Sequence, residues 1–320
     1  WIATDNGLVR YDGLNFKSFT RAVTHQLPLN EIRVLYEGRH GNLWVGTTAG
    51  LTRYIPGRPG SFDQVPAVSG KTVRAIKEAS AGTLWIGTQE QTYASRDGLN
   101  FEIAEDAPTH VRAICEDHDG TLWFGSNAGL FRRQGTTLEQ ITHERLPSRT
   151  SSDSGITQTR VNVVLAGDDG DLWIGTNRAL LHMHRGKFTT RGRELNSQQV
   201  YSLLQTRDGD LYVAARFGLY RSTGDGPFEQ VSSRESVLCV MEDQEGGLWV
   251  GHGNNRGLHC YRNSHAGRVW GEAQVRCAYT ICGVMLPHKS RKSSDLVDHV
   301  SSHRALDCAQ RLADERKDAL

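Results

Sequence analysis

Arginine recurs at one position of a repeated pattern, directly after the first apolar residue of a short β-type segment. Arg33, Arg74 and Arg112 stand there in three copies, and Asn162 and Tyr201 take the same place in two later copies. If these segments surround a common axis, three guanidinium groups would converge and bind a carboxylate or sulfate group, because arginine offers a planar fork of donors. The alternative is that the repeat only prefers a long, solvated side chain at the mouth of a water-filled channel.

The elements that must position these residues follow from the repeat itself. Seven variants of Leu-Trp-Val-Gly-Thr-x-x-Gly-Leu occur at intervals of 37 to 50 residues, and their aromatic residues are Trp1, Trp44, Trp85, Trp123, Trp173, Tyr212 and Trp249. A period near 40 residues, built from β-type segments, is typical of the blades of a β-propeller. We therefore predict an all-β, seven-bladed β-propeller of four-stranded antiparallel blades.

One copy shows the expected blade. Residues 111–115 form a short apolar inner strand, and the turn that follows ends at Gly120, which can adopt a positive φ. Residues 122–126 form the second strand, whose tryptophan is large enough to fill the wedge between blades. Residues 130–133 alternate apolar and charged side chains as a half-buried third strand requires, and residues 138–141 complete the blade at the rim.

Turns that depart from the repeat form a second set of candidate contacts. In one blade, residues 89–92, which include Gln89 and Glu90, replace the usual x-x-Gly-Leu. In the last blade, residues 252–256, which include Asn254 and Asn255, lengthen the same turn. These turns lie at one face of a propeller, where binding residues are expected on loops held by a rigid scaffold. The alternative at each turn is sequence drift without a role.

Composition limits the classes of function. The chain has 320 residues, 38% of them hydrophobic, and 34 glycines that suit frequent tight turns. Its formal net charge is +1, so no overall field favours nucleic acid or an anionic membrane. No apolar run approaches the ~18 residues that a membrane-spanning helix needs. We expect no nucleic-acid partner, no metal and no cofactor.

The strings EDHDGTLWFGSNAGLFRR and EGRHGNLWVGTTAGLTRY, read with the other copies, carry a family resemblance. The pattern resembles the two-component regulator propeller repeat, and the resemblance covers about residues 1 to 262. It implies the extracytoplasmic, periplasmic sensor of a membrane-anchored signalling protein. Such proteins often carry two seven-bladed rings, a small β domain, a membrane helix and an output that is a histidine kinase with a response regulator or a diguanylate cyclase.

The resemblance also implies a set of partners. The expected ligand is a carbohydrate or another small anionic molecule, and the expected protein partner is the downstream signalling domain of the parent chain. Membrane attachment would come only through segments outside this sequence, and the full-length protein is expected to form a homodimer. No kinase, nucleotide-binding or cyclase motif occurs here, so the chain itself is expected not to be an enzyme.

Two other functions remain open at this stage. A streptogramin-lyase-like enzyme would need histidine, glutamate and magnesium, but His110, His182, His184 and His252 are scattered, and spacing alone assembles no base with an orienting carboxylate. A protein-interaction ring would instead present a continuous apolar or charged patch on one face. Magnesium-dependent turnover of a cyclic ester distinguishes the enzyme from both binding functions.

The last predictions concern the two ends of the chain: the incomplete first blade and the C-terminal tail. The sequence begins inside a blade motif, so the propeller, assigned to residues 1–282, would lack the inner strand of its first blade. Residues 274–279 are the candidate to supply that strand; the alternative is that it lay upstream. Residues 283–320 are expected to be a helical, irregular or out-of-frame tail. Cys277, Cys282, His299 and His303 resemble a zinc finger only loosely.

Overall fold

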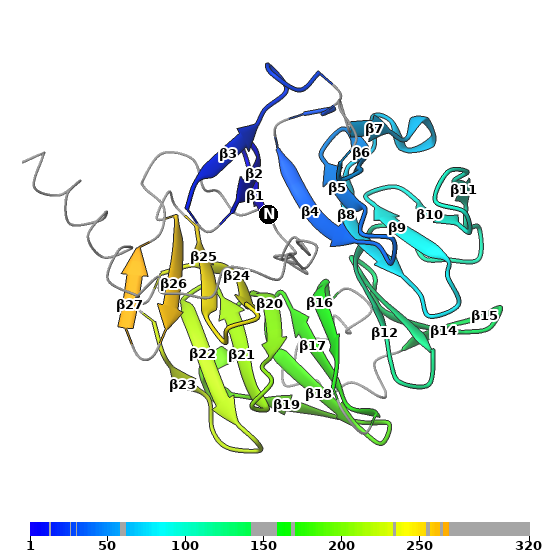
Figure 1. Cartoon of the computed structure of the whole chain (residues 1–320). Helices are drawn as coiled ribbons and strands as arrows, with labels where there is room; N and C mark the ends of the chain where they lie inside the picture. Colours follow the sequence, from blue (N-terminus) through cyan, green and yellow to red (C-terminus); the bar gives the residue numbers. More distant parts are fainter. Residues whose placement is uncertain are drawn as a thin grey trace, which may run out of the picture. The chain divides into compact units, whose positions relative to one another are not determined.

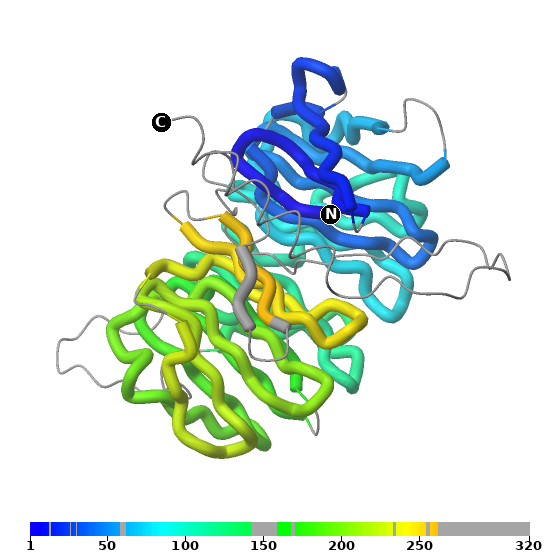
Figure 2. Tube along the Cα trace, turned by 60° about the vertical axis from the view of Figure 1, so that its left-hand side comes forward, coloured from blue at the N-terminus to red at the C-terminus, as the bar shows by residue number. Residues whose placement is uncertain are grey.

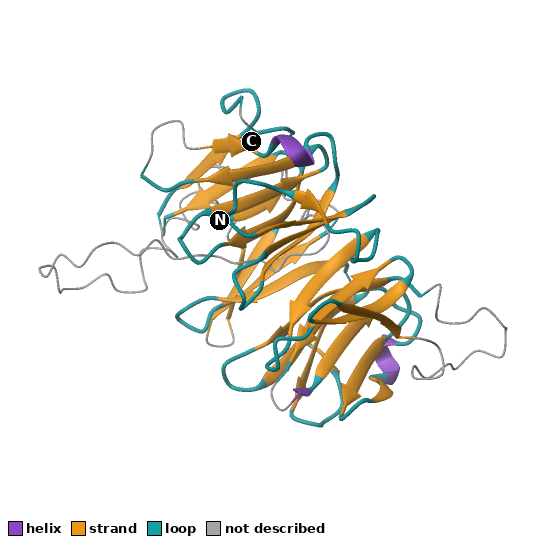
Figure 3. Ribbon diagram, turned by 90° about the vertical axis from the view of Figure 1, so that its right-hand side faces the viewer, coloured by secondary structure: helices purple, strands orange, loops and turns teal. Residues whose placement is uncertain are grey.

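The computed structural model describes residues 1–268, except 13, 26, 30, 58–61, 142–158, 168–169, 233–234, 254–256 and 263–264. All described residues belong to one compact unit, Trp1–Leu286. Within it, seven antiparallel sheets follow one another around a common axis (Figure 1), so the predicted seven-bladed β-propeller is confirmed. Strands and loops make up nearly all of the described chain (Figure 3). In this part of the chain no helix is long and apolar enough to span a membrane.

The strands run from the axis to the rim of each sheet in chain order. Sheet 1 has β1 (Ile2–Thr4), β2 (Gly7–Tyr11) and β3 (Phe16–Phe19), and sheet 2 has β4 (Ile32–Glu37), β5 (Leu43–Thr47), β6 (Gly50–Tyr54) and β7 (Phe62–Gln64). Sheet 3 has β8 (Val73–Glu78), β9 (Leu84–Thr88), β10 (Thr92–Ser95) and β11 (Glu102–Ile103), and sheet 4 has β12 (Val111–Glu116), β13 (Leu122–Ser126), β14 (Gly129–Gln134) and β15 (Thr137–Ile141).

The remaining three sheets repeat this plan. Sheet 5 has β16 (Val161–Ala166), β17 (Leu172–Thr176), β18 (Leu180–His184) and β19 (Lys187–Arg191), and sheet 6 has β20 (Val200–Gln205), β21 (Asp210–Ala215), β22 (Gly218–Thr223) and β23 (Glu229–Gln230). Sheet 7 has β24 (Val237–Glu242), β25 (Leu248–His252), β26 (Leu258–Arg262) and β27 (His265–Arg268). Two 3₁₀ turns, η1 (Pro66–Val68) and η5 (Arg193–Leu195), follow the outer strands of sheets 2 and 5.

Apolar clusters between consecutive sheets form the core. The repeated tryptophan of one sheet packs toward the next sheet: Trp44 lies in the cluster between sheets 2 and 3, Trp85 between 3 and 4, and Trp123 between 4 and 5. Trp173 lies between sheets 5 and 6 in the same way. The apolar alternation therefore serves the interfaces between sheets, because no single sheet can cover both of its faces by itself.

The ring also closes between its last and first sheets. Ile2 and Val9 of sheet 1 form one buried cluster with Trp249 and Leu258 of sheet 7, and the ring centroids of Tyr11 and Trp249 are 6.2 Å apart. Sheets 1 and 7 consequently lie side by side (Figure 2). Sheet 1 has three strands among the described residues. The predicted inner strand at 274–279 and the tail at 283–320 lie outside the described residues.

The Glu-Asp pair of the repeat, Glu116 and Asp117 in sheet 4, makes two different hydrogen-bonded contacts. The Oδ2 atom of Asp117 accepts a 2.8 Å hydrogen bond from Nε1 of Trp123, which satisfies the indole inside the interface. The carboxylate of Glu116 accepts a 2.7 Å hydrogen bond from the backbone N–H of Ser80, in the first turn of sheet 3. The motif thus supplies a partner for the buried tryptophan and a link to the preceding blade.

Sheet 3 lacks the aspartate, and this absence gives a stability prediction. Ala79 takes the place of Asp117, and the buried Nε1 of Trp85 has no hydrogen-bond partner among the described residues. Ala79→Asp should raise the free energy of unfolding by about 0.5–1.5 kcal/mol, because it supplies the missing acceptor. Urea unfolding measures the change. In a Trp85→Phe background the same substitution should give no gain, and a gain there would contradict the explanation.

Candidate functional site

A repeated β-bulge places the predicted arginines. In sheets 2 to 7 the register of the inner strand shifts at its second residue, which therefore has no direct partner on the neighbouring strand. A bulge of this kind redirects a side chain and is common near binding sites. The bulged residues are Arg33, Arg74, Arg112, Asn162, Tyr201 and Leu238.

The turns between second and third strands lie beside these bulges. In sheet 3 the backbone N–H of Gln89 donates a 3.0 Å hydrogen bond to the carbonyl of Thr72, the residue before the inner strand. Asn177 and Arg160 make the same 3.0 Å contact in sheet 5. The structure thus brings the bulged residues and the altered turn of sheet 3 to one end of the sheets. We call this end the strand-entry face; it consists of the starts of the inner strands and the described turns after β5, β9, β13, β17, β21 and β25.

Sheet 3 brings three of the predicted residues into one group. Nη2 of Arg74 donates a 3.1 Å hydrogen bond to Oε1 of Gln89, and Glu90 forms an ion pair with Lys71. The altered turn is therefore in direct contact with the bulged arginine. In sheet 2, Arg33 forms an ion pair with Glu31, which compensates its charge.

The pKa of Arg74 responds to arginines from other sheets. Burial, together with the positive charges of Arg33 and Arg160, lowers the pKa of Arg74 below its ordinary value. Arg33 belongs to sheet 2 and Arg160 precedes the inner strand of sheet 5, so both charges come from sheets other than that of Arg74. The Nε atoms of Arg33 and Arg160 are buried and have no hydrogen-bond partner among the described residues.

Two predicted contact residues are less accessible than the arginines. Asn162 is 5% exposed, and its Nδ2 donates a 3.0 Å hydrogen bond to the carbonyl of Val200 in the next sheet. Tyr201 is 7% exposed. Arg160 was not predicted, because it stands before the first apolar residue of its strand and the repeat pattern gives that position no special place. Asn254 and Asn255 lie outside the described residues, as do the four zinc-finger-like residues of the tail.

A histidine and carboxylate cluster on sheet 5 was also missed. Nε2 of His182 lies 3.0 Å from one carboxylate oxygen of Asp171, and Nδ1 of His184 lies 2.5 Å from the other. Partial burial acts to raise the pKa of Asp171, but the hydrogen bonds to His184 and His182 hold it below its ordinary value. The ring of His182 also stacks on Trp173, with centroids 4.0 Å apart.

Hairpin register could have identified this cluster. Trp173 pairs with His182 across β17 and β18, so Asp171 faces His184 two residues further along the two chains. The arrangement supplies a histidine oriented by a carboxylate, which spacing alone could not assemble. It lies at the end of β17 away from the strand-entry face, so it is separate from the arginines.

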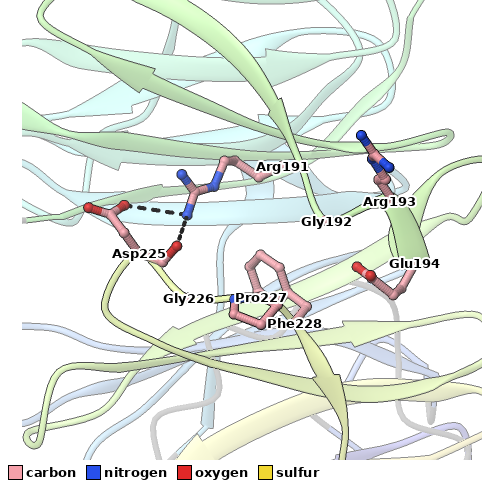
Figure 4. A pocket seen from close by; sticks show the side chains of 8 residues that line it. All are labelled: Arg191, Gly192, Arg193, Glu194, Asp225, Gly226, Pro227 and Phe228. Atoms are coloured by element: carbon pink, nitrogen blue, oxygen red, sulfur yellow. Dashed lines mark hydrogen bonds and ion pairs between the residues drawn. The ribbon is translucent and has the colours of Figure 1, made fainter.

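A shallow pocket of about 270 Å³ lies at the rim, between sheets 5 and 6 (Figure 4). Arg191 crosses its edge and donates a 3.1 Å hydrogen bond from Nη2 to the carbonyl of Asp225, while Phe228 and Gly192 form part of its wall. None of the predicted contact residues lines it. The pocket and the strand-entry face are therefore distinct features.

The fold and the repeat define the class of protein first: a seven-bladed propeller whose blades carry variants of the Trp-x-Gly-Thr strand. Residues 26–49 and 107–128 match the family model described as two component regulator propeller. The predicted resemblance is confirmed at these two segments, which match the two-component regulator propeller repeat. No curated protein matches the chain with significant sequence similarity.

Solved structures share the fold at low sequence identity. The extracellular domain of a hybrid two-component system from B. thetaiotaomicron is 18% identical, with a TM-score of 0.62 over 82% of this chain and 39% of that one. The chain thus spans well under half of that domain. A streptogramin B lyase is 15% identical, with a TM-score of 0.61 over 78% of this chain and 84% of that one.

A catalytically inactive virginiamycin B lyase from Staphylococcus aureus, in complex with quinupristin, is a further structure of the same fold. It is 13% identical to this chain, with a TM-score of 0.59, and the match covers 74% of this chain and 83% of the lyase. At these identities the likeness concerns the fold alone. Sensor domains and enzymes both occur among the similar structures, so function has to be argued from the site.

Proposed function

We propose that this chain is the ligand-binding propeller of an extracytoplasmic sensor, in a bacterial signalling protein of the two-component or diguanylate cyclase type, and that it is not itself catalytic. The observation that carries the proposal is the strand-entry face, where Arg74 contacts the altered turn at Gln89 and faces the charges of Arg33 and Arg160. The two-component regulator propeller repeats and the fold of the B. thetaiotaomicron extracellular domain support it.

A rigid ring suits this task for a physical reason. Contacts from several sheets meet at one face, so a ligand held there can favour one of two arrangements of the ring against its neighbouring domain. The shift is limited to the difference in affinity between the two arrangements. The downstream output domain would read that difference, and the proposed ligand is a carbohydrate or another small anionic molecule.

Binding without turnover is the expected result of a thermal-shift screen with neutral and acidic oligosaccharides. A ligand present at 100 times its Kd adds about 2.7 kcal/mol of stability, which for a domain of this size raises the Tm by roughly 5–10 °C. Mass spectrometry of the ligand, and of quinupristin with added Mg²⁺, should show no product. Conversion of either molecule would indicate an enzyme instead, and a screen without any stabilising compound would contradict ligand binding.

The proposed location has its own test. Protease added to spheroplasts that express the parent protein should degrade this region, as detected with an antiserum raised against the purified chain. A region that is digested only after lysis would contradict the extracytoplasmic location.

A further inference from the structure

The charges at the strand-entry face are not balanced. The carboxylate of Glu31 compensates Arg33, and Glu90 is engaged by Lys71. No ion pair joins Arg74 or Arg160 to a carboxylate of the described residues. Within the described part of the chain, the Arg74 side chain donates a hydrogen bond to the neutral amide of Gln89 alone. Two guanidinium groups at the strand-entry face therefore have no carboxylate counter-charge among the described residues.

We propose that Arg74 and Arg160, with Arg33 beside them, bind an oxyanion group of the ligand, either a carboxylate or a sulfate. This inference rests on the proposed ligand-binding function and specifies its chemistry. It differs from the sequence prediction, because Arg160 takes the role that the repeat pattern gave to Asn162. An anion between the two groups would satisfy the buried Nε of Arg160 and remove the repulsion that Arg74 experiences.

The rest of the ring explains where the anion would lie. The equivalent bulge positions in sheets 6 and 7 carry Tyr201 and Leu238, which are 7% and 8% exposed and offer no positive charge. Sheets 2 to 5 supply the cations, because Arg112 occupies the bulge of sheet 4 between Arg74 and Arg160. The anionic group is thus expected beside the sheets that carry the arginines, and not on the propeller axis itself. The rest of a larger ligand could then extend toward the turns of the strand-entry face. Arginine suits the task because its fork of donors matches two oxygens of one group.

Isothermal titration calorimetry with three probes tests the proposal: trigalacturonic acid, inorganic sulfate and neutral maltotriose. Trigalacturonic acid should bind more tightly than maltotriose, and its affinity should fall with salt. Arg74→Gln and Arg160→Gln should each weaken the acid about 10- to 100-fold, as expected for loss of hydrogen bonds from a charged donor. Arg74→Lys keeps the positive charge but loses the planar fork of donors, so its affinity for trigalacturonic acid should lie between those of the wild type and Arg74→Gln.

Arg132→Gln is the matched control, because it removes the same charge from the outer strands of sheet 4, where Arg132 pairs with Glu139 at 2.6 Å. It should change the affinity less than about twofold, since screening weakens distant charges. A further measurement needs no ligand. Arg74→Gln removes the repulsion from Arg33 and Arg160, so the Tm of the unliganded variant should be no lower than that of the wild type.

Each outcome bears on the proposal. If sulfate binds as well as trigalacturonic acid, the site recognises a free oxyanion; if only the acid binds, it recognises that group on a sugar. Equal affinities for wild type and both glutamine variants would overturn the inference, and so would binding of neither anion. Tight binding of maltotriose, unaffected by the variants, would leave the proposed function standing while this inference fails.

Discussion

Replacing Trp123 by alanine is expected to lower the free energy of unfolding by about 3–5 kcal/mol. Trp123 is 4% exposed and fills the interface between sheets 4 and 5. Its loss would leave a cavity that the rigid neighbouring sheets can fill only in part, and Asp117 would lose the 2.8 Å hydrogen bond from the indole. Urea unfolding followed by circular dichroism measures the change.

Phe217 is the control for this prediction, because it is an aromatic residue that is 45% exposed on the turn after β21. Phe217→Ala should change stability by less than about 0.5 kcal/mol, as is usual for surface positions. If Trp123→Ala also cost under about 1 kcal/mol, the repeated tryptophan would not be the wedge that holds the blades together.

The glycine of the Trp-x-Gly-Thr motif gives the second large effect. A Cβ atom at Gly125 would lie 2.6 Å from Cγ1 of Val161, the first residue of the next inner strand. Gly46, Gly87 and Gly175 meet the first valine of the following blade at the same 2.6 Å. Gly125→Ala should therefore destabilise the protein by about 1–3 kcal/mol through overpacking, measured by the same urea unfolding.

A double-mutant cycle isolates this contact. Val161→Ala removes Cγ1, the atom nearest to the new Cβ atom, so it should cost less in the Gly125→Ala background than in the wild type, by about 1–2 kcal/mol. Ala214 takes the glycine position in sheet 6, and Ala214→Gly gives a comparison in which no clash is relieved. Strict additivity of the two substitutions would contradict close packing between glycine and valine across the blades.

Sequence reasoning found part of the candidate site. The repeat predicted one shared position for Arg33, Arg74 and Arg112, because a fixed position in a repeated strand becomes a fixed position around the ring. The repeat pattern did not point to Arg160, because this residue stands two positions before Asn162, which holds the bulge position of sheet 5. Its long side chain can nevertheless extend to the same end of the sheet. The sequence also did not predict the hydrogen bond from Arg74 to Gln89, although both residues were candidates.

The cluster around Asp171 was missed for a different reason. Asp171 and His184 are 13 residues apart and meet only because β17 and β18 pair in one register. The repeat predicts the two strands but not which of their residues face each other. Register depends on the turn and on which side of the sheet is buried, so it is fixed by packing.

The sequence by itself determined the period, the four-stranded blade and the place of the tryptophan in each blade. These features follow from alternation within strands and from turn glycines, which act over a few neighbouring residues. Only the tertiary structure decided how Trp249 of the last blade meets Ile2 of the first, and which charges face each other at the strand-entry face. The reason is physical: contacts between sheets depend on the spacing and curvature of the whole ring, which no single repeat encodes.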